Sequence, residues 1–455
     1  MKSKPATLLR GTVITVDSDR RVIDDGGVVV TGETISAVGP FSAVRADYPA
    51  ATIVGDSRDL VVPGFINGHQ HLTGDRLLQA TIPDDLEPGA AIFEWAVPLH
   101  ASHTPEDDEL SATLALVESL ERGITTTVEA GTVAHPDRVA AAARQVGARI
   151  TLGTWGWDVE EGPFAAPADE VLDRQRMVIE RDEGPLVTPW VTLVGHDLMS
   201  DALVTGASAL AQKHHTGLTF HLSPSVSDGE QYLARTGLRP AVHLRQLGVL
   251  GPHVLIGHGV HIDDDELEAI LETDTAVAAC PWAYLRLGQG TTRAFRHLDL
   301  WLGGGRLAIG CDTENAGDAI DAVRAAALFA GLAKDVPMDP TVFTAHHALE
   351  LLTRRGAEAI GMGEQIGSIE VGKQADLVVI DRRGPAWVPV SSDPVLQLVW
   401  KGVAGSVRDV WIAGSRVVAD GSSTRVDIET ITVEAHRAAM SLADRSGVRA
   451  APRWA

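Results

Sequence analysis

The stretch that decides the fold is Val61-Val62-Pro63-Gly64-Phe65-Ile66-Asn67-Gly68-His69-Gln70-His71-Leu72. A short apolar run ends here in two histidines that are separated by one residue. Because successive side chains of a strand point to opposite faces, His69 and His71 project together from the end of this strand. Two imidazoles placed in this way can ligate one divalent cation. A bare His-x-His is more often a pair of surface histidines after a turn, so the rest of the chain decides between the two interpretations.

The composition is that of a soluble globular protein with a large core, since 45% of the 455 residues are hydrophobic and 22% are charged. The length suggests two or three domains, although one (β/α)8 barrel would take up more than half of it. The 38 Lys and Arg residues are outnumbered by 61 Asp and Glu residues, which gives a net charge of −23. No basic run stands out, so we expect neither a nucleic acid nor a membrane surface as a partner.

The chain contains two cysteines, Cys280 and Cys311, and both lie in apolar runs. We therefore expect buried free thiols and no disulfide framework. The N-terminal residues lack an apolar signal core with a cleavage site, and no apolar run reaches the length of about eighteen residues that spans a membrane. These features predict a cytoplasmic, reducing location.

Strand-like and helix-like segments alternate along the middle of the chain. After the strand that carries His69, apolar runs typical of strands occur at 125–129, 149–153, 189–195, 218–222, 254–257, 276–279 and 307–310. Helix-like stretches separate them; in residues 107–122, leucines and a valine recur at helical spacing after an acidic first turn. These eight β-then-α units are the sequence outline of a (β/α)8 barrel, and a helix around residues 339–361 ends the series.

Residues typical of strands and turns occupy both flanks of this region. The first sixty residues contain three short strand-like runs, and residues 366–380 and 407–418 return to the same pattern. We therefore expect a small β domain assembled from both ends of the chain. The predicted division is 1–60 for the first part of that domain, 61–364 for the barrel, 365–427 for the second part, and 428–455 for a C-terminal helix and tail.

Two segments resemble signatures of the amidohydrolase superfamily. Pro63, Gly64, Phe65, Asn67 and the two histidines match its first barrel strand, which ends in Pro-Gly-Phe-x-(Asn/Asp)-x-His-x-His. Residues 366–380 are similar to its Ile-Gly-Ser-Leu-x-x-Gly-Lys-x-Ala-Asp-Leu-Val signature. The resemblance is greatest to the branch of the cytosine and guanine deaminases, the triazine hydrolases and imidazolonepropionase. It implies an α/β fold, a (β/α)8 TIM barrel with a small β-sandwich domain built from both chain ends.

Metal-ligand or acid–base side chains follow four of the predicted strands at their carboxyl ends, where the active sites of such barrels lie. They are His69 and His71 after the first strand, His221 after the fifth, His258 after the sixth and Asp312 after the eighth. The resemblance implies that one cation is held by His69, His71, His221 and Asp312. Zn²⁺ suits this set best, and Fe²⁺, Co²⁺ and Mn²⁺ are alternatives. It also implies that Asp312 passes a proton from the activated water to the leaving nitrogen, while His258 polarises the substrate.

One position departs from the ring-deaminating members of this branch. Those members carry a glutamate three residues after the histidine of the fifth strand, and it moves protons to a ring nitrogen of the substrate. Here the sequence reads His221-Leu222-Ser223-Pro224, and a proline side chain can neither donate nor accept a proton. Asp228, Glu230 or Glu129 could take over this task, although acids at 228 and 230 are also typical of the first turn of a helix.

Several further residues are candidates for the wall of a substrate pocket. They are His196 after the fourth strand, Trp95 and Trp157 in loops after the first and third strands, and Trp282 and Tyr284 after the seventh. Tyr284 stands where the family's similar Cys-Pro-x-x-Asn segment has its asparagine. Phe93 and Trp155 suit core packing and substrate stacking equally well. We expect structural roles for three other histidines, His261, His346 and His347.

The missing glutamate favours hydrolysis of a nonpeptide carbonyl C–N bond, in an amide, cyclic imide, urea or carbamate, because such a carbonyl is already electrophilic. The nearest alternative is an aminohydrolase that releases ammonia from a nitrogen heterocycle, and a chlorohydrolase is a more distant one. A noncatalytic barrel that binds a ligand is the alternative of another class. We expect a small-molecule substrate, and the resemblance implies a homodimer or a higher even oligomer.

Overall fold

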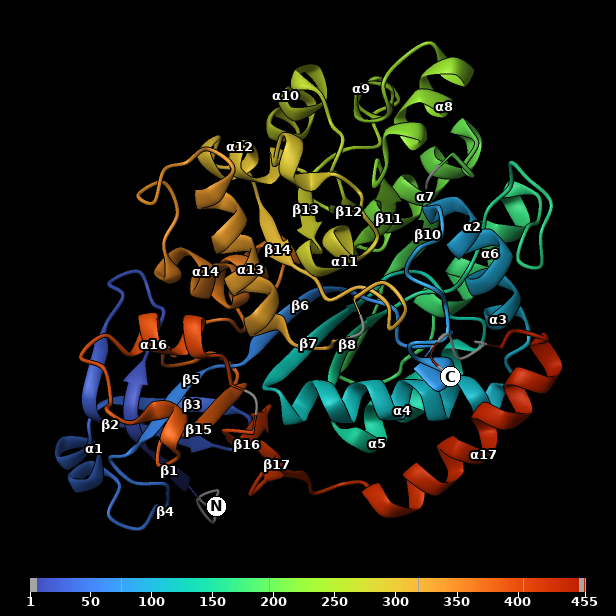
Figure 1. The fold of residues 1–455 in the computed structure, drawn as a ribbon. Coiled ribbons are helices and arrows are strands. Elements are labelled where there is room, and N and C mark those ends of the chain that lie inside the picture. Colours follow the sequence, from blue (N-terminus) through green and yellow to red (C-terminus); the bar gives the residue numbers. More distant parts are fainter. Residues whose placement is uncertain are drawn as a thin grey trace.

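The computed structural model describes residues 6–74, 76–195, 197–317, 319–403, 405–449 and 454. Its centre consists of parallel strands, which form one sheet in the order β6, β7, β8, β9 and a second in the order β10 to β14 (Figure 1). The strands are rich in β-branched residues and are buried on both faces, as expected for a parallel sheet. Their bounds are β6 Phe65–Gln70, β7 Ile124–Glu129, β8 Arg149–Leu152, β9 Val187–Pro189, β10 Val191–Gly195, β11 Leu218–Leu222, β12 Val254–His258, β13 Ala276–Ala279 and β14 Leu307–Ile309.

The two parallel sheets are connected at both edges. On one side β9 runs directly into β10, with Trp190 alone between them. On the other side a parallel bridge joins Gln70 in β6 to Asp312 after β14. The N–H groups of Cys311 and Asp312 also donate to the carbonyl oxygen of His69, over 3.1 and 2.9 Å. The carboxyl ends of the first and last parallel strands therefore meet, which brings the residues that follow them together.

Helices follow the parallel strands along the chain and lie around them (Figure 1). α4 begins at a capping box formed by Thr104 and Asp107, and its leucines Leu116 and Leu120 are fully buried in the core shared with the strands. The predicted alternation of strands and helices is confirmed. The helices are η1 Arg76–Leu78, α2 Pro88–Ala90, η2 Ala91–Ala96, α3 Val97–Ala101, α4 Pro105–Glu121, α5 Pro136–Val146, α6 Ala168–Ile179, α7 Asp201–Lys213, α8 Val226–Thr236, α9 Pro240–Gln246, α10 Asp264–Glu272, α11 Pro281–Arg286, η3 Thr291–Arg293, α12 Arg296–Leu302, α13 Ala322–Asp335, α14 Ala345–Leu352 and α15 Arg354–Ala359.

Strands from both ends of the chain share one nine-stranded sheet, at the lower left of Figure 1. The two ends meet where β5 pairs with β15 antiparallel. There the carboxylate of the fully buried Asp59 forms ion pairs with Arg383 and Arg408, each over 2.7 Å. The predicted joining of the two flanks is thus observed. The elements are β1 Ala6–Ile14, β2 Val22–Thr31, β3 Thr34–Pro40, α1 Phe41–Asp47, β4 Thr52–Val54, β5 Asp59–Pro63, β15 Leu377–Asp381, η4 Pro385–Trp387, α16 Pro394–Lys401, β16 Val407–Ile412, β17 Ser415–Ala419 and β18 Ser422–Ser423.

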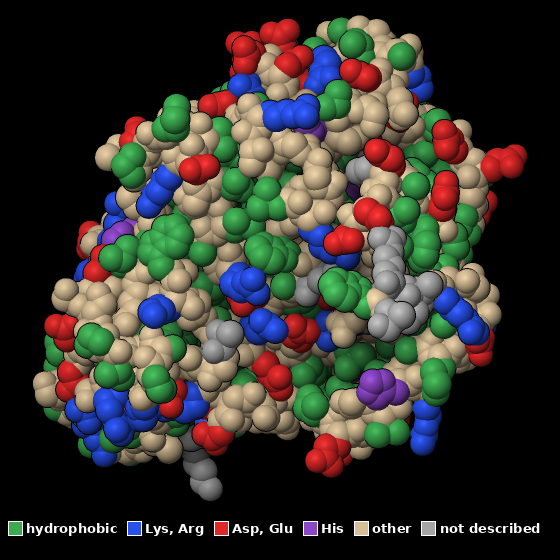
Figure 2. All heavy atoms as spheres, in the orientation of Figure 1, with side chains coloured by type: hydrophobic (Ala, Val, Ile, Leu, Met, Phe, Trp, Pro, Cys, Tyr) green, Lys and Arg blue, Asp and Glu red, His purple; other side chains and the backbone are tan. Residues whose placement is uncertain are grey.

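The last helix, α17 (Ile428–Ser446), lies along α4 and α3 (Figure 1). Its Leu442 is fully buried, and Arg445 Nε donates to the carbonyl oxygen of Ser102 over 3.1 Å. In the part of the chain that the structure describes, no helix is long and apolar enough to cross a membrane. Acidic, basic and hydrophobic side chains are interspersed over the face shown in Figure 2.

Candidate active site

The His-x-His segment lies at the carboxyl end of β6, and Asn67 holds it in place. The Asn67 Oδ1 atom accepts from the backbone N–H of His69 (3.3 Å) and of Cys311 (3.0 Å), while its Nδ2 donates to Gln70 Oε1 over 2.9 Å. Asn67 is fully buried, so this amide ties the end of β6 to the residues after β14. An asparagine before the two histidines therefore has a physical role in aligning the first and last strands.

Two glycines make room for the imidazole of His69. A Cβ atom added to Gly257 would lie 2.6 Å from His69 Cε1, and one added to Gly310 would lie 2.7 Å from His69 Cβ. Both distances are too short for any side chain, so the ends of β12 and β14 approach the His69 side chain only because these residues are glycines. The imidazole of His69 is thereby enclosed between the ends of β12 and β14.

His71 and His221 face one another through their Nε2 atoms, which lie 3.2 Å apart. His221 Nδ1 lies 2.6 Å from the carbonyl oxygen of Val194, and a carbonyl can only accept, so Nδ1 carries the proton. His71 Nδ1 lies 2.9 Å from Thr132 Oγ1, whose hydroxyl hydrogen is donated to Glu129. Thr132 and the Val194 carbonyl thus hold the Nδ1 sides of the two rings and leave their Nε2 atoms facing one another. A cation between the two Nε2 atoms would be bound by both rings.

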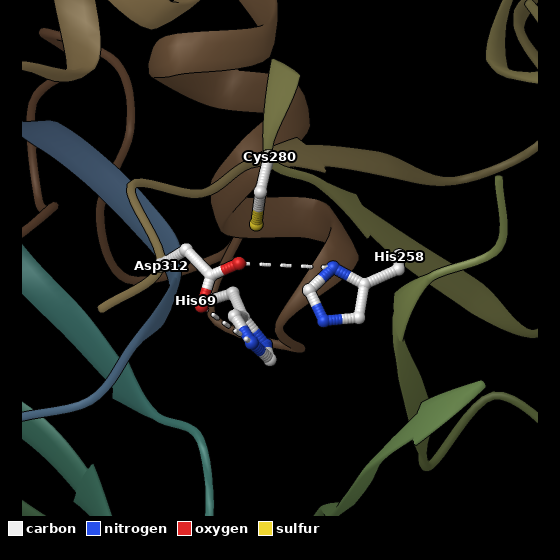
Figure 3. Close-up of side chains that lie close together, drawn as sticks. All are labelled: His69, His258, Cys280 and Asp312. Carbon is white, nitrogen blue, oxygen red and sulfur yellow. Dashed lines mark ion pairs between the residues drawn. The ribbon is translucent and has the colours of Figure 1, made fainter. Parts of the chain in front are cut away.

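Asp312 lies opposite these rings. Its Oδ1 atom is 3.5 Å from His71 Nε2 and 4.0 Å from His69 Nε2, and its Oδ2 atom is 4.0 Å from His258 Nδ1. Figure 3 shows Asp312 and His258 pointing toward one another, with His69 beside them. Both residues have positive φ angles, 66° for Asp312 and 79° for His258, which L-residues adopt at a cost. The backbone at both strand ends is thus turned so that these side chains converge.

The convergent side chains fit a divalent metal ion. Ligand atoms of His69, His71 and His221 lie within 4.8 Å of one another, and those of His69, His258, Cys280 and Asp312 form a second such group. Two nitrogen ligands of a tetrahedral zinc ion are about 3.3 Å apart, close to the observed separation of the two facing Nε2 atoms. Burial raises the pKa of the Cys280 thiol well above its usual value.

Glu129 supports the site from behind. Its carboxylate is fully buried and accepts from the N–H groups of Gly131 (2.7 Å) and Thr132 (3.2 Å) and from the Thr132 hydroxyl (3.3 Å). Burial raises the pKa of Glu129 to about 7, although these hydrogen bonds partly oppose the change. Since Thr132 contacts His71, Glu129 orients a histidine of the site and does not line the substrate cavity.

A cavity of about 120 Å³ lies beside the convergent side chains. Its walls are mainly aliphatic and aromatic, and Asp312 is the only carboxylate among the described residues that line it. The polar groups come from the site itself and from a few neighbours. The lining residues are His71, Ile92, Phe93, Ala96, Val97, His100, Thr132, Trp155, Trp157, Val194, Leu198, His221, Pro224, His258, Leu287, Gln289, Asp312, Thr313 and Ala316.

The structure separates the predicted pocket residues into two groups. Trp157 lines the cavity, and so do Phe93 and Trp155. Trp95 instead packs beside α17, Trp282 stacks with the guanidinium of Arg324, and Tyr284 is 1% exposed beneath His258. The fourth-strand histidine, His196, lies outside the described residues.

None of the three acids named as substitutes for the missing glutamate reaches the cavity. Pro224 is buried and forms part of the cavity wall. Asp228 accepts from the backbone N–H of Ser223 over 2.8 Å in the first turn of α8, and Glu230 is exposed on the same helix. Glu129 is hydrogen-bonded to Gly131 and Thr132 and does not line the cavity. Position 224 therefore faces the substrate space with a side chain that cannot move a proton.

The other histidines have structural roles, as the sequence predicts. His261 Nε2 donates to the carbonyl oxygen of Gln289 over 2.7 Å, His346 pairs with Asp393, and His347 belongs to the capping box of α14. Sequence reasoning missed His100, Leu198 and Gln289, which line the cavity. His100 lies in the short helix α3, and Leu198 and Gln289 lie in loops, so no repeating pattern in the sequence pointed to them.

Comparisons with known proteins agree with this arrangement. The chain matches the Amidohydrolase family over residues 60–417 and a bacterial imidazolonepropionase-like composite domain over residues 26–51. A protein of Syntrophobacter fumaroxidans named 5-methylthioadenosine/S-adenosylhomocysteine deaminase is 32% identical over 93% of this chain and 95% of its own length. A protein of the same name from Thermodesulfovibrio yellowstonii is 28% identical over 91% of this chain and 93% of its own length.

Two solved structures are similar to this chain over nearly its whole length. An adenosine deaminase from Xanthomonas campestris with bound zinc superimposes with a TM-score of 0.90 at 27% identity, covering 98% of this chain and 99% of that one. A triazine hydrolase from Arthrobacter aurescens, at 23% identity, shares the fold with a TM-score of 0.87 and covers 96% and 99% of the two chains. The chain therefore belongs to the amidohydrolase family and is an enzyme that hydrolyses a carbon–nitrogen bond other than a peptide bond.

Proposed function

We propose that this protein hydrolyses a carbonyl C–N bond, of the amide, cyclic imide, urea or carbamate type, in a substrate with an apolar planar group. His69, His71, His221 and Asp312 would hold one divalent cation, with Zn²⁺ favoured by three imidazoles and one carboxylate. A cation in this position supplies Lewis acidity and a nucleophilic water at neutral pH. The zinc in the Xanthomonas neighbour and the facing Nε2 atoms of His71 and His221 support this assignment.

Asp312 would transfer the proton, and His258 would polarise the substrate carbonyl. The Asp312 carboxylate accepts the proton of the attacking water and donates it to the leaving nitrogen as the C–N bond breaks. The His258 imidazole, which also lines the cavity, donates a hydrogen bond to the carbonyl oxygen on which negative charge develops. Their separation of 4.0 Å between His258 Nδ1 and Asp312 Oδ2 supports two distinct roles at one reacting centre.

The observation that carries the choice of bond is Pro224. An aromatic C–NH₂ centre becomes electrophilic only when a ring nitrogen is protonated, and that requires an acid beside the ring. Pro224 occupies this part of the wall, and Asp312 is the only carboxylate among the described lining residues. A carbonyl carbon needs only polarisation at oxygen and one proton at nitrogen, which Asp312 and His258 supply.

The cavity wall favours an apolar substrate. Trp155 and Trp157 lie with their ring centroids 5.9 Å apart, and both are less than 5% exposed. Leu198 and Leu287 extend the same wall, and no Lys or Arg is among the described lining residues. Such a surface suits a flat aromatic or aliphatic group and gives no counter-ion for an anionic one.

The second candidate is an aminohydrolase of a nitrogen heterocycle, and the names of the relatives favour it. The similar proteins from Syntrophobacter and Thermodesulfovibrio are both named as deaminases of adenosine derivatives. This activity would need a proton donor other than residue 224, and a set of polar partners for ribose hydroxyls. Outside the proposed metal and catalytic set, the described wall offers His100, Thr132, Gln289 and Thr313 as polar groups, and none of them is a carboxylic acid.

Exchanging residue 224 tests the proposal. Pro224→Glu introduces the missing acid, and Pro224→Gln is the matched control, because glutamine has the same size but cannot transfer a proton. We expect Pro224→Glu to release ammonia from aminated heterocycles roughly 100-fold faster than Pro224→Gln, on the scale of general acid catalysis, without faster hydrolysis of carbonyl substrates. Efficient ammonia release by the wild-type enzyme, with no gain in Pro224→Glu, would contradict it.

We also infer that the two parallel sheets make one closed (β/α)8 barrel, with Gln70 and Asp312 at its seam. The direct continuation of β9 into β10 and the bridge between the first and last strand ends support this closure. Residues 61–364 would form this barrel domain. The strands of residues 1–60 and 365–427 would form the second domain, whose shared sheet supports the division.

A further inference from the structure

The backbone of His258 is held in an unusual conformation at the end of β12. Its φ angle is 79°, in the left-handed region where a Cβ atom is unfavourable. Its carbonyl oxygen lies 2.6 Å from Nε2 of His297 in α12. Because a carbonyl oxygen can only accept, the Nε2 atom of His297 carries the proton and donates it to His258. This contact fixes the peptide plane immediately after the residue whose side chain lines the cavity.

His297 is a buried hydrogen-bond donor that is neutral near pH 7. It is 2% exposed, and burial lowers its pKa to about 4, with the hydrogen bond to the His258 carbonyl partly opposing the change. Its ring stacks on Tyr284 with a centroid distance of 5.6 Å and an interplanar angle of 15°. Phe295 and Phe329 pack at 5.7 and 6.4 Å. The ring is therefore fixed on several sides and does not reach the cavity itself.

Tyr284 contacts both the backbone and the side chain of His258. Its hydroxyl oxygen accepts from the backbone N–H of Cys280 over 2.8 Å, and its hydroxyl hydrogen points toward the carbonyl oxygen of His258 over 3.5 Å. The ring of Tyr284 also meets that of His258 edge-on, with 5.7 Å between centroids. Tyr284 thus links the end of β13 to the end of β12, directly below the His258 imidazole.

We propose that His297, supported by Tyr284, is a positioning residue that holds the His258 backbone in its left-handed conformation and so aims the His258 imidazole at the substrate carbonyl. The inference rests on the role proposed above for His258. Without the Nε2 donor, the His258 peptide relaxes toward an ordinary conformation and the imidazole swings away from the reacting atom. Displacements of about 1 Å in such a group are enough to cost on the order of 100-fold in rate.

Two substitutions separate the hydrogen bond from the packing of the ring. His297→Phe retains the aromatic stack on Tyr284 and removes the donor. His297→Gln removes the stack but keeps an N–H group that can reach the His258 carbonyl. His253→Phe is the matched control, because His253 precedes the same strand at its other end, where its ring hydrogen-bonds Ser208 far from the site.

We expect kcat of His297→Phe to fall by about 10- to 100-fold, with KM within threefold of the wild type and unchanged metal content. His297→Gln should recover most of kcat, and His253→Phe should behave as the wild type. A crystal structure of His297→Phe should show a negative φ at residue 258. A kcat of His297→Phe within twofold of the wild type, with φ of residue 258 still near 79°, would overturn the proposal.

The test does not depend on the bond that is hydrolysed, because the ratios are measured on whichever substrate the wild type turns over fastest. If His258→Asn keeps full activity, the catalytic role of His258 is wrong. The φ angle of residue 258 in the His297→Phe crystal then still decides whether His297 holds this backbone. A loss of kcat and of thermal stability in His297→Gln that is absent from His297→Phe would assign His297 to packing alone and refute the positioning role.

Discussion

The Nε2 atoms of His71 and His221 lie 3.2 Å apart, while the Nδ1 atoms of the two rings hydrogen-bond to Thr132 and to the Val194 carbonyl. These two buried hydrogen bonds turn the Nε2 atoms of both rings toward one point, where a cation would be bound by both. The other two proposed ligands, His69 and Asp312, can be tested separately.

His69→Ala should remove the metal and the activity together while leaving the fold intact. The ring of His69 lies between glycines, so its loss leaves a small space and no strained neighbour. Metal content per chain, measured on purified protein by mass spectrometry, checks the result. His346→Ala is the control, because His346 is an exposed histidine that pairs with Asp393 and is not among the proposed ligands. Full metal occupancy in His69→Ala would refute the ligand assignment.

Thr132→Val should weaken metal binding by roughly 10- to 100-fold, the usual effect of losing a hydrogen-bond partner of a ligand. The substitution keeps the shape of the side chain but removes the oxygen that accepts from His71 Nδ1 and donates to Glu129. Thr132→Ser keeps the hydroxyl and should bind metal as the wild type does. Competition with a chelator of known affinity measures the difference, and equal affinities in the Val and Ser variants would exclude this role.

His258→Asn should lower kcat by roughly two to four orders of magnitude and leave the metal content nearly unchanged. The reason is that His258 polarises the substrate carbonyl and is not needed to hold the cation. Steady-state kinetics together with metal analysis separate the two roles. Activity within a few-fold of the wild type would move the polarising role to another group at the cavity, with His100 the next residue to replace.

The pair of Asp108 and His135 should make stability depend on pH. The hydrogen bond to Asp108 raises the pKa of His135. Protonated His135 therefore stabilises the folded state. This stabilisation is complete below the unfolded pKa of about 6.5 and is lost as the pH rises through the raised pKa of the folded state. Burial alone would raise the pKa of Asp108, but hydrogen bonds from its two histidines lower it overall, so its contribution is lost only as the pH falls through that lowered value.

His135→Gln should therefore lower the melting temperature more at pH 5.5 than at pH 8.5. His346→Gln, which removes an exposed pair with Asp393, should have little effect at either pH. Thermal unfolding followed by circular dichroism at the two pH values provides the measurement. An equal loss at both pH values would show that the charge on His135 contributes nothing.

The strand ends could be predicted from the sequence because their side chains follow a simple rule. Residues after successive parallel strands meet at one edge, so His69, His71, His221, His258 and Asp312 could be grouped before any coordinates were known. Of the two roles left open for Asp228, substitute proton donor or first turn of a helix, the structure favours the second, since its carboxylate accepts from Ser223 N–H at the start of α8.

The cavity wall could not be predicted in the same way. Tyr284 was expected at the pocket because its position in a signature suggested it, but its side chain turns below His258 and bonds Cys280. His297 carried no signal, because its partner is a backbone carbonyl in a strand 39 residues earlier. Contacts of this kind depend on how the helices pack against the strands, and the periodicity of one sequence does not predict that packing.

The most direct test of the central claim is the kcat/KM of the wild-type, zinc-loaded enzyme on two matched panels. The products measured are the carboxylate from amides and imides, the carbon dioxide from ureas and carbamates, and the ammonia from aminated heterocycles. One panel contains aromatic N-acyl compounds, cyclic imides, ureas and carbamates, and the other contains adenosine, 5-methylthioadenosine, guanine and aminated triazines. The account predicts that the best carbonyl substrate exceeds the best aminated heterocycle by at least about 100-fold, the scale of a missing general acid. Ammonia release from an aminated heterocycle that is faster than any carbonyl hydrolysis would contradict it.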